Sequence, residues 1–64
     1  MNSKRAKEIC KEYEFTMHYQ RIHDPSWNIE NPKNGYGHMM PNKFFKELSE
    51  SDFIKYMEQM KNPK

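Results

Sequence analysis

The first third of the chain carries apolar residues at helical spacing and contains no Gly or Pro. The recurring apolar positions are Ala6, Ile9, Cys10, Tyr13 and Met17. At about 100° per residue they fall on one stripe of a helix. Asn2 or Ser3 can cap its first turn, because both side chains accept hydrogen bonds from free backbone N–H groups. The pattern predicts an N-terminal helix over about residues 3–23.

A second pattern overlaps the end of this helix. Residues 13–19 alternate strictly between apolar and polar side chains and are rich in aromatic rings, which is typical of a half-buried strand. A strand would need a turn after the first helical segment, and nothing between Lys11 and Tyr13 resembles one. The helix is therefore the leading interpretation. An α+β fold with residues 13–19 as a third strand is the alternative.

The central segment has the features of a β-hairpin. Asp24-Pro25 ends the first element, and Asn31-Pro32-Lys33-Asn34-Gly35 is a strong turn sequence. Apolar and polar residues alternate on both sides of that turn, at Trp27 and Ile29 before it and at Tyr36, His38 and Met40 after it. We expect a short hairpin over about residues 27–40.

The last third of the chain predicts two short helices. A continuous helix would place Phe44 and Phe53 on opposite sides, so a break between them is required. The spacing of Ser49 and Asp52 matches a capping box and supplies that break. The helices are expected at about residues 43–49 and 52–61. With the N-terminal helix they predict a mainly α fold in a single small domain, residues 1–64.

Length and composition limit how much of this chain can be buried. It has 64 residues, of which 34% are apolar. Only about 60% of the unfolded surface can be buried at this size, so we expect another protein or a second copy, as in a homodimer, to assist the core. A lone cysteine allows no internal disulfide, and no apolar run has the length of a membrane span or signal peptide. A cytoplasmic protein is expected.

Positive charge is concentrated at the N-terminus, although the formal net charge is only +2. The cations concerned are Lys4, Arg5, Lys7, Lys11 and, further along, Arg21. With neighbouring aromatic residues they form a pattern that can hold single-stranded nucleic acid, by ion pairs to phosphates and stacking of bases. A small nucleic-acid-binding protein is therefore the alternative function.

Residues for catalysis or metal binding are sparse. Cys10 lies on the predicted buried stripe, where a thiol behaves as a small apolar group. On a helix Cys10 and His18 are about 12 Å apart along the axis, too far to share a metal ion. The nearest set to a metal site is His23, Asp24 and His38. We expect no enzyme activity, no metal and no cofactor.

The remaining signal is a set of aromatic, aliphatic and Met side chains in the central segment. Its members are Trp27, Ile29, Tyr36, Met39 and Met40. Trp and Tyr are enriched at the centres of protein interfaces, and Met adapts to irregular partners. So small a core can hardly bury all of them. The leading hypothesis is a non-enzymatic protein-binding module of the inhibitor or adaptor type, which uses this set as its contact surface.

Overall fold

The computed structural model describes residues 1–62, and this part of the chain forms three α-helices and a three-stranded antiparallel β-sheet. In chain order the elements are α1 (Ser3–Tyr13), β1 (Thr16–Gln20), β2 (Ser26–Glu30), β3 (Gly37–Pro41), α2 (Asn42–Glu47) and α3 (Glu50–Lys61). The fold is therefore α+β. The prediction of a mainly α fold is wrong, because an entire strand stands where the second half of the N-terminal helix was expected.

The first helix ends at Tyr13 instead of continuing to residue 23. Glu14 takes a left-handed conformation, with φ of 63°. Its N–H donates to the carbonyl of Lys11 at 3.1 Å, and the N–H of Phe15 donates to Cys10 at 2.8 Å. These two bonds close the helix in a Schellman motif, which usually employs Gly at this position. A single residue thus makes the turn for which the sequence offered no signal, and the alternating pattern that follows forms β1.

The predicted hairpin is confirmed as β2 and β3. Two backbone hydrogen bonds close its turn. The N–H of Asn31 donates to the carbonyl oxygen of Tyr36 at 2.7 Å, and the N–H of Gly35 donates to the carbonyl oxygen of Asn31 at 2.9 Å. Gly35 has φ of 78°, a conformation that glycine adopts without strain. β1 pairs with the other side of β2, so the sheet order is β1-β2-β3 and both β1 and β3 are edge strands.

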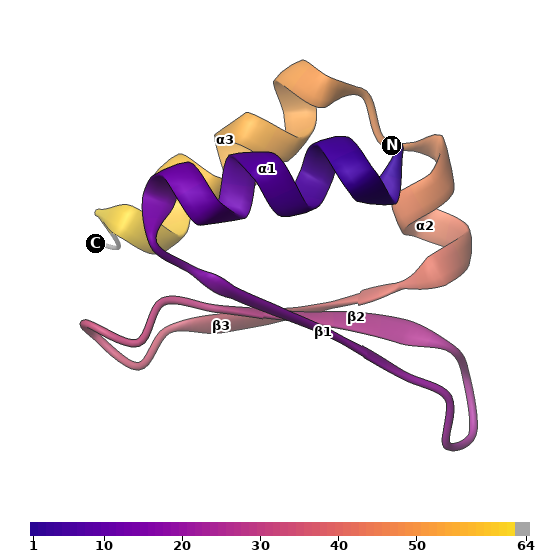
Figure 1. Ribbon diagram of the computed structural model, residues 1–64. Coiled ribbons are helices and arrows are strands. Elements are labelled where there is room, and N and C mark those ends of the chain that lie inside the picture. Colours follow the sequence, from indigo (N-terminus) through magenta and orange to yellow (C-terminus); the bar gives the residue numbers. More distant parts are fainter. Residues whose placement is uncertain (63–64) are drawn as a thin grey trace.

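All three helices lie on one side of the sheet (Figure 1). α1 and α3 run side by side in the same direction. Arg5 near the start of α1 pairs with Glu50 at the start of α3, and Tyr13 at the end of α1 bonds to Glu58 near the end of α3. The opposite face of the sheet is covered by no element of residues 1–62.

The two C-terminal helices lie close to their predicted positions but begin earlier. Asn42 starts α2, one residue before the expected 43–49. Ser49 is the N-cap of α3 and accepts a hydrogen bond of 3.2 Å from the N–H of Asp52, so that helix starts at Glu50 and not at residue 52. Ser49 therefore caps the last helix, as its spacing from Asp52 predicts, and the helix begins two residues earlier than expected.

The strand register decides which side chains enter the core. Two cross-strand rows face the helices, Met17–Ile29–His38 and Tyr19–Trp27–Met40. The row between them, His18–Asn28–Met39, faces outward. Together with α1 and α3, the helix-facing rows enclose a core whose largest fully buried members include Phe45, Phe53 and Met57. Successive residues of one strand therefore point to opposite sides, one toward the core and the next toward the uncovered face of the sheet.

Candidate functional site

The sheet divides the predicted contact residues between its two sides. Trp27, Ile29 and Met40 lie in the core, with exposures of 9%, 1% and 0%. Tyr36 and Met39 are 53% and 56% exposed. Met39 belongs to the outward row, and Tyr36 lies in the turn before β3. These five side chains therefore do not form one surface, and only two of them are available to a partner.

Trp27 is held by contacts on several sides. Its ring centroid lies 4.7 Å from that of Tyr19 and 5.4 Å from that of Phe45. Its indole N–H donates to the side-chain oxygen of Asn42 at 3.2 Å. A buried Trp needs such a partner for its polar atom. The residue therefore connects β1, β2 and α2, and most of its surface is used in contacts within the chain.

The N-terminal cations separate into two groups. Arg5 points toward α3, where its Nε lies 2.9 Å from Glu50 Oε1 and its guanidinium 3.5 Å from Glu8. The hydrogen bond to Glu50 raises the pKa of Arg5 and lowers the pKa of Glu50. Lys7 points the other way, with its ammonium 5.7 Å from the centre of the Trp27 ring. Arg5 is thus paired with two carboxylates, and Lys7 lies over the Trp27 ring of β2.

Lys4 and Lys11 lie on the same side of α1 as Lys7. They are three and four residues from it, which is the spacing of neighbours along one helix face. Both are exposed, and so is Arg21, which follows directly after β1. The structure therefore brings three of the five predicted cations together along one flank of α1. We call these three, Lys4, Lys7 and Lys11, the lysine row.

A small hollow lies next to the lysine row. Its volume is about 350 Å³, and the residues that line it are Met1, Ser3, Tyr19, Trp27, Asn42, Phe45 and Lys46. Tyr19 is its most accessible ring, with 41% of its surface exposed. Among these lining residues Lys46 is the only charged side chain and no carboxylate occurs. We call this feature the edge hollow, because Tyr19 belongs to the edge strand β1.

The outer edge of β1 has no strand partner within residues 1–62. Ile22, two residues after the strand, is 71% exposed. Neither Tyr19 nor Ile22 was among the predicted contact residues, because both were assigned to the N-terminal helix. The alternation over residues 13–19 was the available signal. It would have placed Tyr19 in a strand if the strand had been preferred, although the position of that strand at the sheet edge is set by the tertiary structure.

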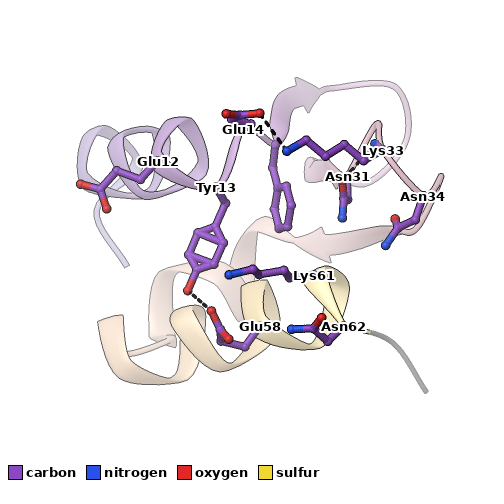
Figure 2. A pocket seen from close by; sticks show the side chains of 10 residues that line it. Glu12, Tyr13, Glu14, Asn31, Lys33, Asn34, Glu58, Lys61 and Asn62 are labelled. Atoms are coloured by element: carbon purple, nitrogen blue, oxygen red, sulfur yellow. Dashed lines mark hydrogen bonds and ion pairs between the residues drawn. The ribbon is translucent and has the colours of Figure 1, made fainter.

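A second, polar cleft of about 780 Å³ lies where the ends of α1 and α3 meet the β2–β3 turn (Figure 2). The hydroxyl of Tyr13 donates to Glu58 at 2.5 Å, and Lys33 pairs with Glu14 at 3.0 Å. Lys61 places its ammonium 5.9 Å from the centre of the Tyr13 ring. The bond to Glu58 raises the pKa of Tyr13 to about 12. The Tyr13 hydroxyl and Glu58 are thus bound to each other, and so are Lys33 and Glu14, so these four side chains are engaged in contacts within the chain.

The residues considered for nucleophilic or metal chemistry are dispersed. Cys10 is 2% exposed, lies against the sulfur atoms of Met17 and Met57, and burial raises its pKa to about 11. The ring of His38 packs against that of Tyr56, with the two centroids 4.9 Å apart and the planes tilted by 35°. Within residues 1–62 no three His, Cys, Asp or Glu residues are grouped so that they could hold a metal ion. His23, Asp24 and His38 therefore do not converge.

Comparison of the chain with models of protein families, with curated proteins and with solved structures returns no match. None of the helices in residues 1–62 has both the length and the apolar character needed to cross a membrane.

Proposed function

We propose that this protein is a non-enzymatic protein-binding module that accepts an extended segment of its partner as a fourth strand beside β1. The observation that carries the proposal is the open edge of β1. In strand addition, backbone hydrogen bonds along the edge supply affinity, and pockets for alternate side chains supply specificity. The edge hollow, which Tyr19 of β1 helps to line, could receive one side chain of the added strand and so act as such a pocket.

β1 lacks the devices by which natural proteins protect an exposed edge. Charged side chains, proline and bulges normally prevent unwanted pairing. The sequence of β1, Thr-Met-His-Tyr-Gln, contains neither a charged residue nor a proline. The other edge strand, β3, starts at Gly37 and ends at Pro41, which weaken strand pairing at both ends. The two edges therefore differ, and β1 is the better template.

The exposed apolar residues near β1 fit the same interpretation. Tyr19 presents 41% of its surface on the strand itself, and Ile22 presents 71% just beyond it. An added strand would cover both the Tyr19 ring and the entrance to the edge hollow. Tyr is among the residues that contribute most at interfaces, because it buries a large area with few rotatable bonds.

Selection from a displayed library of random peptides tests the proposal without a known partner. We expect enriched peptides that shift the backbone amide resonances of Thr16–Gln20 when they are added to the labelled protein. Tyr19→Ala should weaken their binding about tenfold or more, equivalent to about 1.4 kcal/mol. Met39→Ala is the matched control, because it truncates an exposed side chain of the other edge strand without a change of charge. Enriched peptides that shift only resonances outside β1 would contradict strand addition.

A second candidate function is the binding of single-stranded nucleic acid. The specific observation in its favour is the position of Lys7 over the Trp27 ring, between Lys4 and Lys11. Phosphate contacts make such binding strongly dependent on salt. Gel-shift titrations over a range of salt concentrations should then display a steep loss of affinity. Absence of any shift near physiological ionic strength would remove this function.

A further inference from the structure

The lysine row lies on the flank of α1 that faces away from α3. Arg5 and Tyr13, through Glu50 and Glu58, mark the side of α1 that faces α3. Lys7 projects from the other side and reaches the Trp27 ring of the sheet. In Figure 1, α1 and β1 lie together on the near side of the molecule, with α3 behind α1. Lys7 therefore lies over the sheet on the side of α1 away from α3, and helical spacing puts Lys4 and Lys11 along the same flank, toward the side of the molecule where β1 is the edge strand.

We propose that the segment bound by β1 is acidic, with carboxylates at alternate positions that pair with the lysine row. This inference rests on the strand addition proposed above and specifies the chemistry of the partner. Successive residues of a strand point to opposite sides of a sheet, so every second side chain of the added strand would face the helices. The proposed carboxylates are among these helix-facing side chains. The remaining side chains of that strand would face solvent with the outward row.

The dimensions of the two elements agree with this pairing. Lys4 and Lys11 are separated by about 10 Å along a helix that rises 1.5 Å per residue. In a strand with a rise of about 3.3 Å per residue, carboxylates four residues apart span about 13 Å. Long, flexible Lys side chains accommodate the difference. Two or three acidic residues at alternate positions therefore match the length of the lysine row.

The surrounding charges leave this side of α1 positive. Glu8 lies 3.5 Å from Arg5, and Glu14 is paired with Lys33. Glu30 lies opposite Thr16 in the β1–β2 ladder, next to the helix-facing pair Met17–Ile29, so its side chain is on the outward face of the sheet. Asp24 is the nearest acid along the chain after β1, and Arg21 precedes it. Lys46 adds a further cation at the edge hollow. An anionic segment therefore complements the surface.

The same surface is less suited to nucleic acid. Trp27 is only 9% exposed, so its ring offers almost no face on which a base can stack. Tyr19 alone presents a ring at the edge hollow. The formal net charge of +2 is also small for a protein that must follow a phosphate backbone. A short acidic peptide in extended conformation requires neither several stacking surfaces nor a long basic track.

The peptide selection described above also tests this inference, through the sequences that it enriches. We expect Asp or Glu at alternate positions and binding that weakens as salt is added, since exposed charge pairs are screened. Lys11→Glu should reduce affinity about tenfold. Lys55→Glu is the matched control, because it makes the same charge change on α3, where the side chain is 77% exposed. The control should alter affinity by less than about twofold.

The outcomes separate the two proposals. Peptides that bind at β1 without enrichment of acidic residues would overturn the acidic partner and leave strand addition in place. A library that yields no peptide bound at β1 would overturn both. Equal loss of affinity in Lys11→Glu and Lys55→Glu would mean that net charge matters and the lysine row does not. Tight binding of an oligothymidine near physiological salt, with no peptide enriched, would favour nucleic acid instead.

Discussion

The side-chain amide of Asn31 donates a hydrogen bond of 3.1 Å to the carbonyl oxygen of Met60. Asn34 donates to the same oxygen at 3.0 Å. Carbonyl groups in the last turn of a helix have no partner within the helix. The β2–β3 turn therefore also caps the C-terminal end of α3, and a local turn sequence fixes the position of a helix almost thirty residues away.

Replacing Asn31 should destabilise the protein more than replacing Asn34. Asn31 is 4% exposed and its side-chain oxygen also accepts from the N–H of Lys33, so Asn31→Ala removes two hydrogen bonds from a buried position. The expected loss is about 1–3 kcal/mol in the free energy of unfolding. Asn34→Ala also removes two hydrogen bonds, one to the Met60 carbonyl and one from the N–H of Tyr36, but it should cost less than about 1 kcal/mol, because Asn34 is exposed and water can replace them. Urea denaturation of both variants measures the difference, and equal small losses would contradict the capping role.

Adjacent methionines in β3 provide a sharp test of the sheet orientation. Met40 is completely buried and Met39 is 56% exposed. Met40→Ala should lower the free energy of unfolding by about 2–5 kcal/mol, because it opens a cavity in the core. Met39→Ala should change it by less than about 0.5 kcal/mol. Thermal or urea unfolding of both variants checks the prediction. Similar effects at the two positions would show that the strand register is different.

The thiol of Cys10 should be unreactive in the folded protein. Burial raises its pKa to about 11, so the nucleophilic thiolate is scarce near neutral pH, and the side chain is only 2% exposed. We expect Ellman's reagent at pH 8 to modify Cys10 rapidly in denaturant and only through unfolding in buffer. A fast reaction in buffer, independent of added denaturant, would contradict the burial of this residue.

Tyr13 should ionise at a higher pH than a free tyrosine does. Its hydrogen bond to Glu58, together with burial and the Glu58 charge, raises its pKa from 10.0 to about 12. A raised pKa in the folded state means that the stabilisation is complete below pH 10 and is lost as pH rises toward 12. Spectrophotometric titration of tyrosinate absorbance should therefore contain a group that ionises near pH 12. Glu58→Gln should return that group toward its ordinary pKa, whereas Glu12→Gln, which removes a weaker influence, should move it much less.

Local signals in the sequence determined the hairpin and the two C-terminal helices. The Asn31–Gly35 turn closes through its own backbone and side chains, and Gly35 takes the conformation that its lack of a side chain permits. Ser49 caps α3 through the N–H of a residue three positions later. Each of these features depends on atoms within a few residues along the chain, so sequence patterns alone predict it, with errors of two residues or fewer at the helix starts.

Only the tertiary structure decided where α1 ends and which apolar residues are buried. Glu14 adopts the left-handed conformation without being a glycine, so its own preference gives no warning. Trp27 and Met40 enter the core because the three helices cover one face of the sheet, whereas Met39, on the other face, stays outside. The sequence identified a set of apolar side chains and the alternation of a strand. Which of them are exposed depends on contacts between segments far apart in the chain, and within residues 1–62 those contacts leave the outer edge of β1 without a strand partner.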